Sequence, residues 1–450
     1  MKPTPLSRRR FLKSAAAVSV LAGVKIPFVH AAEDNTLQIA LVGCGGRGTG
    51  AASNALSVTG PPIKLVAMAD VFERKLKGSL KGLQSQHPTQ VDVPEDRQFV
   101  SFDGYKNAID SLKPGGIAIF TTPVAFRWVH YKYAIEKGIN VFMEKPISTD
   151  GPTTRRMIEL NKLAMAKNMK VAVGLMCRHC KGRKELSSRI EQGELGDILL
   201  LRAYRVQAPV ASFRSKKKPD DVKELHYQID RFHSFLWASG GAYSDFNIHN
   251  IDEACWMKGA WPVEAKGNGG RHYRDDWVDQ NFDAYSTEFT FADGTKFFFE
   301  SRNIEGCHGE FATYAHGTKG LALVSSAGHS PAKCKIFKGQ NIKSEDIVWA
   351  FPQPEPNPYQ LEWDDFIEAI RTDKPYNEVQ RSAEASLVTA MGRMASHTGQ
   401  VIKYDEALAW EHEFAPDVDK LTMDSPAPLL ADASGKYPVP QPGITKKREY

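Results

Sequence analysis

A lysine at the end of a short apolar run is the first residue whose position suggests chemistry. Lys145 lies in the segment Glu144-Lys145-Pro146, which ends the strand-like run 140–145. In open α/β sheets, ligands bind at the carboxyl ends of the strands. A lysine at that edge can donate a hydrogen bond to a substrate hydroxyl and stabilise developing alkoxide charge. Pro146 would fix the turn that aims it, and the alternative is a solvated surface lysine.

A second chemical pair lies in the segment 240–256. Asp245 and His249 are four residues apart, so they share one face if the segment is helical. The histidine can take a proton near neutral pH, and the carboxylate can hold its tautomer or bind a second hydroxyl. The alternative is that Asp245 caps a helix and that His249 lies in the core with its hydrogen bonds made by protein groups. We predict no metal site, because no third ligand with recognisable spacing accompanies the pair.

A glycine-rich segment lies upstream of both. Gly43-Cys44-Gly45-Gly46-Arg47-Gly48 has the G-x-G-x-x-G pattern, ends a strand-like run and opens a helical stretch. Such glycines allow a tight turn, backbone approach to a pyrophosphate and close packing of helix on strand. Asp70 ends the next run, where a carboxylate accepts hydrogen bonds from ribose hydroxyls and repels a 2′-phosphate. The pattern therefore favours NAD, although Arg74 keeps NADP open.

The first part of the chain must position these residues. From residue 37 to about 175, five strand-like runs (37–43, 63–70, 116–122, 140–145 and 170–176) alternate with amphipathic stretches (50–57, 71–83, 124–137 and 152–167). This alternation predicts a doubly wound parallel sheet covered on both faces, a Rossmann domain over 36–175.

The second part of the chain has a different pattern of apolar residues. Longer runs with period-two alternation (196–208, 283–303 and 310–325) contain turns at 292–294 and 316–318, which predicts hairpins in a large, mostly antiparallel sheet. Helical stretches at 357–372 and 380–396 would close this α+β substrate domain, 176–410. One face of its sheet would be open, which favours a homo-oligomer, a dimer or tetramer. The Pro-rich residues 411–450 are predicted to form an extended tail along the surface.

The N-terminal residues 1–31 have the parts of a signal peptide: a basic start, an apolar stretch and a small-residue exit near Ala31. The order Ser7-Arg8-Arg9-Arg10-Phe11-Leu12-Lys13 resembles a twin-arginine signal, so we expect the export machinery as a partner and a periplasmic or otherwise exported location. A membrane anchor is disfavoured, because the apolar stretch is short and Lys25 interrupts it.

The overall charge of +5 comes from the same segment, which holds six of the 58 Lys and Arg residues and no acidic residue. The remaining 52 basic residues face 53 acidic ones, so a mature chain would carry −1, and nothing supports a nucleic-acid partner.

Six cysteines are too sparse for a disulfide scaffold. Cys177 and Cys180 follow a strand-like run, and residues three apart in extended chain lie about 10 Å apart, beyond disulfide reach. With no second C-x-x-C to complete a zinc site, we predict free, buried or neutral thiols.

Together these motifs resemble the Gfo/Idh/MocA family of sugar and polyol oxidoreductases, over about residues 36–405. The resemblance rests on the glycine fingerprint, Thr122-Pro123 with His130, Glu144-Lys145-Pro146, and Asp245 with His249. It implies that Lys145 and His249 handle the proton, that Asp245 orients the substrate, and that hydride passes between a ring carbon and nicotinamide. The cofactor contacts that it implies are Gly43, Gly45, Gly46, Arg47, Gly48, Asp70, Thr122, Pro123, His130, Glu144 and Lys145.

Three further residues are expected at the substrate. Arg178 follows the last Rossmann strand, where the resemblance implies that it lines the sugar pocket. Asn247 stands where the family usually has glycine, and its amide can add a substrate hydrogen bond. Trp237 is one of several aromatic and polar residues near the pair that suit a carbohydrate ring.

The predicted function is hydride transfer between a sugar, polyol or glycoside and a tightly bound NAD, with NADP not excluded. A nucleotide loaded before export cannot exchange, so it must return to its starting oxidation state while it is bound to the protein. Two alternatives stay open: a redox-neutral, NAD-dependent glycosidase, and a sugar-binding protein that holds the cofactor without turnover.

Overall fold

The computed structural model describes residues 35–274 and 276–450, so the predicted signal peptide lies outside the described residues. The first sheet has six parallel strands in the order β3-β2-β1-β4-β5-β6. Its strands are β1 (Leu37–Val42), β2 (Ile63–Asp70), β3 (Gln98–Val100), β4 (Ile117–Phe120), β5 (Asn140–Met143) and β6 (Val171–Val173). The predicted doubly wound parallel sheet is confirmed.

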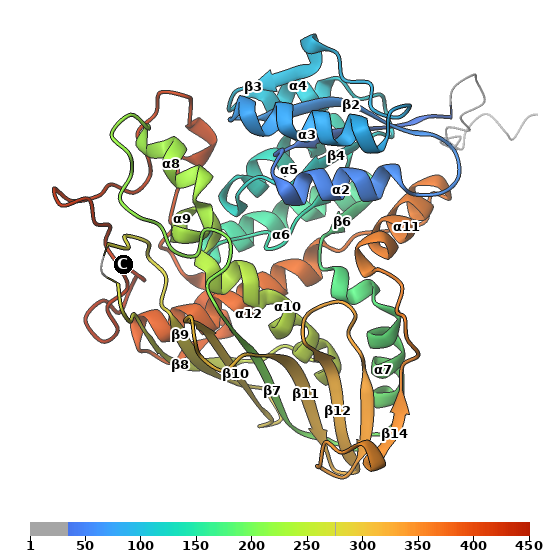
Figure 1. Ribbon diagram of the computed structural model, residues 1–450, viewed down its shortest axis with the longest axis vertical. Helices are drawn as coiled ribbons and strands as arrows, with labels where there is room; N and C mark the ends of the chain where they lie inside the picture. Colours follow the sequence, from blue (N-terminus) through green and yellow to red (C-terminus); the bar gives the residue numbers. More distant parts are fainter. Residues whose placement is uncertain (1–34, 275) are drawn as a thin grey trace, which may run out of the picture. The chain divides into compact units, whose positions relative to one another are not determined.

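Helices cover both faces of this sheet (Figure 1). Alternate residues of β1 point to opposite faces: Ile39 and Leu41 pack with one helix layer, and Ala40 and Val42 pack with the other. The first layer consists of α2 (Gly46–Leu56), α3 (Glu73–Gln86) and α11 (Pro358–Arg371). The second layer consists of α4 (Gly104–Asp110), α5 (Arg127–Lys137) and α6 (Gly151–Ala166).

The position of α11 differs from the sequence-based assignment of 357–372 to the second domain. Trp363 stacks on Phe142 of β5 with ring centroids 4.3 Å apart, and Phe366 and Ile367 are buried in the same cluster. The amphipathic pattern correctly predicted a helix with one apolar face. It could not show that this face packs against a sheet more than 180 residues earlier in the chain.

The second sheet has nine strands in the order β14-β13-β12-β11-β7-β10-β9-β8-β15. They are β7 (Ile198–Gln207), β8 (Glu264–Gly270), β9 (Ala284–Thr290), β10 (Lys296–Asn303), β11 (Glu310–Gly317), β12 (Gly320–Ser326), β13 (Lys335–Lys338), β14 (Ile347–Ala350) and β15 (Ile402–Lys403). The two predicted hairpins are present, as β9 with β10 and β11 with β12. Only the β7–β10 pair is parallel, so the sheet is mostly antiparallel, as expected.

One face of the second sheet is covered by α10 (Gly241–Lys258) and α12 (Val379–Thr398) (Figure 1). The other face carries exposed apolar side chains, among them Leu199 and Phe298. The remaining helices and turns are η1 (Glu95–Arg97), η2 (Val124–Phe126), η3 (Met176–His179), α7 (Lys181–Glu191), α8 (Glu224–Asp230), η4 (Phe232–Ser234), α9 (Leu236–Ser239), η5 (Ser344–Asp346), α13 (Tyr404–Ala409) and η6 (Val418–Lys420).

The C-terminal residues 411–450 are irregular apart from η6, but their end is not on the surface. Glu449 is 3% exposed, accepts from Arg393 Nη2 at 2.8 Å and lies 2.7 Å from His397 Nδ1. The predicted surface tail is therefore wrong at this end, because a buried arginine on α12 takes its carboxylate partner from the tail. Composition alone identified the irregular backbone and missed this ion pair.

All six cysteines are unpaired, and all except Cys307 are buried. This confirms the prediction of free thiols, although one premise was wrong: Cys177 lies in the 3-10 turn η3 rather than in extended chain. Burial raises the pKa of both the Cys177 and the Cys180 thiol. Within the described part of the chain, no helix is long and apolar enough to cross a bilayer.

Candidate active site

The glycine fingerprint forms a tight turn from β1 into α2. Gly43 has φ +95°, a region that L side chains rarely adopt, and a Cβ at Gly48 would lie 2.1 Å from Gly43 O. A Cβ at Gly45 or Gly46 would instead meet open space. Gly45 is the N-cap of α2 and offers no side-chain cap, so the first-turn amides remain available to an anion. These features fit the pyrophosphate of a dinucleotide.

Asp70 is held at the end of β2 by two backbone amides. Its Oδ2 accepts from Cys44 N at 2.6 Å, and its Oδ1 accepts from Phe72 N at 2.8 Å. Burial raises the pKa of this carboxyl, opposed by the two hydrogen bonds and by Lys75. Each oxygen keeps a second lone pair, so the fixed carboxylate can still accept from ribose hydroxyls. Arg74, the residue that kept NADP open, donates to Asp230 at 2.7 Å.

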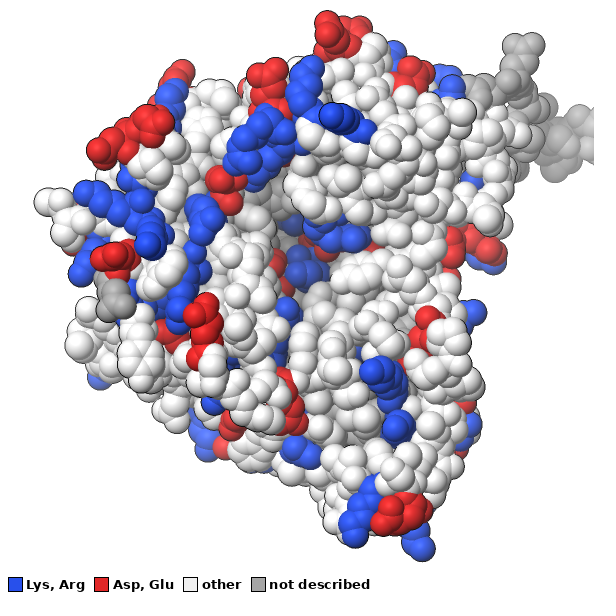
Figure 2. Space-filling view, viewed as in Figure 1, with Lys and Arg blue, Asp and Glu red and all other residues white. Residues whose placement is uncertain are grey.

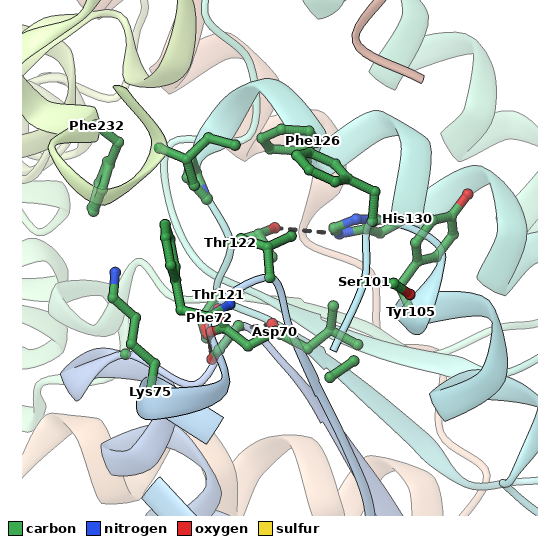
Figure 3. Close-up of a pocket in the computed structure, with 18 residues that line it drawn as sticks. Asp70, Phe72, Lys75, Ser101, Tyr105, Thr121, Thr122, Phe126, His130 and Phe232 are labelled. Carbon is green, nitrogen blue, oxygen red and sulfur yellow. Dashed lines mark hydrogen bonds between the residues drawn. The ribbon is translucent and has the colours of Figure 1, made fainter. Parts of the chain in front are cut away.

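A pocket opens beside Asp70 at the carboxyl ends of β1, β2 and β4, and Figure 3 shows its lining side chains. Thr122, Pro123 and His130, which were predicted as cofactor contacts, line this pocket. His130 Nδ1 lies 3.2 Å from Thr122 Oγ1, and its ring lies 4.5 Å from that of Tyr105. Burial and Arg127 lower the pKa of His130 to about 3, so its imidazole is neutral.

The wall of this pocket also includes residues from the second part of the chain. Ile229 of α8 and Phe232 of η4 line it, and Figure 3 shows Phe232 across the pocket from His130. No sequence pattern predicts this contribution, because α8 and η4 are short and lack clear periodicity.

Arg47 and Glu144, both predicted at the cofactor, bind each other. Arg47 Nε lies 2.5 Å from Glu144 Oε1, and Arg47 Nη2 lies 3.6 Å from Glu362 Oε1. Burial opposes the charge of the guanidinium, but the two carboxylates outweigh burial and raise the pKa of Arg47. Its side chain is thus paired with protein carboxylates, which leaves its backbone amide for an anion.

Lys145 connects the Rossmann edge to α10. Its Nζ donates to Asp245 O at 2.7 Å and lies 3.6 Å from Asp245 Oδ1. The other carboxylate oxygen lies 3.2 Å from His233 Nε2, and His233 Nδ1 lies 2.9 Å from Ser212 Oγ. Burial alone would raise the pKa of Asp245, but Lys145 and His233 outweigh it and hold this pKa well below its usual value. Asp245 is therefore an ionised carboxylate.

His249 lies one helical turn further along α10 and is buried. Its Nδ1 lies 3.9 Å from Cys177 Sγ, and its ring centroid lies 4.3 Å from that of His329. Burial, His329 and Lys145 lower the pKa of His249 well below its usual value, so the imidazole is neutral. Among the described residues it forms no hydrogen bond to Lys145.

Two residues that sequence reasoning missed join this cluster. Arg205 of β7 donates through Nη1 to Phe246 O, and the same nitrogen lies 3.1 Å from His329 Nε2. His329 comes from the loop between β12 and β13. No spacing in the sequence links two residues that are 124 positions apart, although an arginine within an apolar alternating run was a signal worth noting.

Trp237 is not a substrate contact. Its side chain is 0% exposed, its Nε1 donates to Gln228 Oε1 at 2.6 Å, and its ring lies edge-on to Phe126 at 6.3 Å. The prediction was wrong because this indole packs in the core that joins the Rossmann helices to α8 and α9.

Arg178 is paired with a protein carboxylate, contrary to the prediction, and Asn247 is buried with an amide nitrogen that is unpartnered within the described ranges. Arg178 donates through Nε and Nη2 to Asp252 at 2.8 and 2.7 Å, with its guanidinium over the Trp256 ring, so it holds η3 to α10. Asn247 is 1% exposed, and its Nδ2 has no hydrogen-bond partner among the described residues. A role for Asn247 toward substrate stays a prediction.

No group of three His, Cys, Asp or Glu side chains in the described ranges could hold a metal ion.

No family model matches the chain. It is 24% identical over 349 residues to scyllo-inositol 2-dehydrogenase (NAD(+)) of Bacillus subtilis, which covers 76% of this chain and 88% of that protein. Among solved structures it is similar to aldose-aldose oxidoreductase from Caulobacter crescentus complexed with glycerol, with TM-score 0.63, 17% identity and coverage of 82% of this chain and 99% of that one. Levoglucosan dehydrogenase in complex with NADH and levoglucosan has TM-score 0.61, 17% identity and coverage of 82% and 99%. The chain thus shares the two-domain fold of these oxidoreductases and is distantly similar in sequence to one such dehydrogenase.

Proposed function

We propose that the chain is a Gfo/Idh/MocA-like oxidoreductase that transfers hydride between a sugar, polyol or glycoside and bound NAD. The observation that carries the proposal is the contact of Lys145 with Asp245. Lys145 lies at the carboxyl end of the parallel sheet, the same end at which the pocket beside Asp70 opens. The distant similarity to an NAD-dependent inositol dehydrogenase supports it. Asp70 favours NAD, and NADP is kept as the second candidate.

The residues divide into those that hold the nucleotide and those that handle the hydroxyl. The amides at Gly45 and Gly46 would bind the pyrophosphate, Asp70 the ribose, and Thr122, Pro123 and His130 the nicotinamide end. When bound, the nicotinamide supplies the hydride acceptor for the carbon being oxidised.

Side chains of the protein would handle the proton of the substrate hydroxyl. Lys145 would hold the hydroxyl oxygen through Nζ and stabilise its developing negative charge. The ionised Asp245 would orient the hydroxyl and keep Lys145 in place. His249 and Lys145 are the two candidates for the group that takes the hydroxyl proton.

The direct test is to load the protein with NAD or NADP and add a panel of sugars, polyols and chromogenic glycosides. We expect reduced nucleotide to accumulate on the protein, and a Lys145→Met variant to bind the nucleotide without reducing it. Release of the aglycone without net reduction would instead identify a redox-neutral glycosidase. Sugar binding with neither reaction would identify a binding protein.

We further propose export by the twin-arginine route with the nucleotide already bound. The basic, apolar and small-residue order of 1–31 supports export. Ile229 and Phe232, which complete the pocket wall, support retention of the nucleotide. Mass spectrometry of natively purified protein should find the nucleotide, and its loss on simple dialysis would contradict a resident cofactor.

The exposed face of the second sheet supports a homo-oligomer. Leu199 of β7 is 60% exposed and Phe298 of the neighbouring β10 is 44% exposed. Large exposed apolar patches are typical of interaction surfaces. Size-exclusion chromatography with light scattering should show a dimer or tetramer, and Leu199→Glu with Phe298→Glu should yield a monomer.

A further inference from the structure

Arg205 is a half-buried arginine without a carboxylate partner. Its guanidinium lies over the rings of Phe246, at 5.1 Å, and Phe311, at 4.8 Å. Only Nη1 is hydrogen-bonded, to Phe246 O and His329. Nε is buried without a partner, and within residues 35–274 and 276–450 neither Nε nor Nη2 forms a hydrogen bond or an ion pair.

Several other arginines among the described residues pair with a carboxylate, whereas the buried Arg127 donates only to the carbonyl oxygens of Phe120 and Thr122. Ion pairs join Arg178 to Asp252, Arg183 to Glu253 and Arg393 to Glu449. Arg178 and Arg393 use the Nε–Nη2 edge for a two-point contact with the carboxylate. The same edge of Arg205 has no partner. Arg127 also lacks a carboxylate, but both of its Nη atoms donate to carbonyl oxygens. The Nε–Nη2 edge of Arg205 stays free among the described residues, so it can bind a carboxylate from outside the chain as the same edge of Arg178 and Arg393 binds a protein carboxylate.

The guanidinium belongs to the cluster around Lys145. Phe246, whose carbonyl it binds, follows Asp245 directly on α10, and His329 also contacts His249. The pKa values of His249 and His329 both lie well below the usual value, because both rings are buried and lie near cationic side chains. Lys145 and Arg205 therefore contribute two positive charges against the one carboxylate of Asp245, since Arg183 is paired with Glu253.

Figure 2 shows basic side chains, with acidic ones beside them, in a hollow on the displayed face of the molecule. Burial lowers the pKa of Arg205 to about 10, which leaves it fully charged near neutral pH.

We propose that Arg205 binds a carboxylate of the substrate through its Nε–Nη2 edge, so that the substrate is an acidic sugar, a uronic acid or uronide. The inference rests on the proposed oxidoreductase function, whose substrate class it narrows. A planar carboxylate matches the guanidinium fork with two parallel hydrogen bonds. His329, whose Nε2 lies 3.1 Å from Arg205 Nη1, has a buried Nδ1 without a partner among the described residues and is a further donor.

The first test varies the ligand and leaves the protein intact. Calorimetry on nucleotide-loaded protein would compare D-glucuronate and D-galacturonate with glucose and galactose, with the uronate methyl esters and with the sugar 6-phosphates. We expect one uronate to bind about 10²-fold tighter than its neutral sugar and its methyl ester, since a hydrogen-bonded buried charge is lost in both. Equal affinities, or preference for the 6-phosphate, would overturn the carboxylate assignment.

The second test varies the arginine. Arg205→Gln should lower the ratio of uronate to neutral-sugar affinity by about 10²-fold, and Arg205→Lys should restore part of it as a charge without the fork. Arg202→Gln is the matched control, because Arg202 lies on the opposite face of β7, over the Tyr314 ring at 3.9 Å. It should keep the uronate preference. An unchanged preference in Arg205→Gln would refute the inference, and if that variant does not fold, the ligand comparison on unaltered protein decides.

Turnover with the same ligands separates the two proposals. If uronates bind through Arg205 but no sugar reduces the nucleotide, the acidic-ligand inference stands and the oxidoreductase proposal fails. If neutral sugars reduce the nucleotide and uronates have no advantage, the function stands and the inference fails. If no sugar of either kind binds, both are rejected.

Discussion

The proposed nucleotide side and the proposed reaction side of the site are built in opposite ways. The pocket beside Asp70 is formed mainly by consecutive β–α turns of one sheet, with backbone amides, apolar walls and a single fixed carboxylate, Asp70. The reaction side collects buried polar and charged groups from the turn after β5, from β7 and α10, and from the loop after β12. The first side would recognise its ligand by shape and backbone geometry, and the second depends on side chains drawn from separate elements. Substitutions on the two sides should therefore affect different quantities.

The largest effect is expected for Lys145→Met. Loss of a positioned proton-handling group should slow reduction of the bound nucleotide about 10²- to 10⁴-fold, while nucleotide affinity stays unchanged. Stopped-flow measurement of reduced nicotinamide and a separate nucleotide titration would check both quantities. Lys77→Met, at an exposed position on α3, is the control. Near-normal rates in Lys145→Met would contradict the assignment of Lys145 to the reaction side.

Next in size is the buried pair of the C-terminal segment. Glu449→Gln leaves Arg393 as a buried, unpaired charge and should lower the free energy of unfolding by about 3–5 kcal/mol. Urea unfolding at neutral pH would measure it, with Glu411→Gln, at an exposed tail position, as control. Equal stability of the two variants would show that the tail is not part of the core.

The same carboxylate gives a pH dependence. Burial alone would raise the pKa of Glu449, but Arg393 and His397 outweigh it and lower this pKa to about 2. In the unfolded chain a glutamate titrates near about 4.3, so the stabilisation is complete above that pH and is lost as pH falls toward about 2. The stability of Glu449→Gln should decline less steeply over this acid range. A slope identical to that of the unaltered protein would contradict the assignment.

On the nucleotide side, Asp70→Ala should act on affinity rather than rate. Loss of the ribose contact should weaken NAD about 10- to 10²-fold and NADP less, because the carboxylate also repels the 2′-phosphate. Nucleotide titrations with both forms would measure the ratio. Equal losses for NAD and NADP would count against Asp70 as the ribose partner.

The smallest effect is expected for Trp237→Phe. The variant loses the hydrogen bond to Gln228 and should be destabilised by about 1 kcal/mol, with an unchanged KM for sugar. Thermal unfolding and steady-state kinetics would test this. A large rise in KM without a change in stability would indicate that Trp237 contacts the substrate.

The contrast between the two sides also explains what the sequence could predict. The glycine turn, Asp70 and the strands around them follow from local patterns, because each residue acts within one β–α unit. Lys145, Asp245 and His249 were found because short motifs carry them, and their roles stay predictions.

The failures share a physical cause. Arg205, His329 and the Glu449–Arg393 pair depend on contacts between segments far apart in the chain, which no periodicity encodes. Trp237 was misplaced because residue type alone does not distinguish a core aromatic side chain from one that faces a sugar. Arg178 was misplaced because its carboxylate partner, Asp252, lies on a different element.

The central claim, hydride transfer from a sugar carbon to the bound nucleotide at Lys145, is tested most directly with deuterium. Nucleotide-loaded protein would be mixed with fully C-deuterated sugars, neutral and uronate, and its nucleotide analysed by mass spectrometry after one turnover. The account predicts transfer of one deuterium to the nicotinamide in the unaltered protein and none over the same time in Lys145→Met. Unlabelled nucleotide in the unaltered protein with every sugar would contradict it.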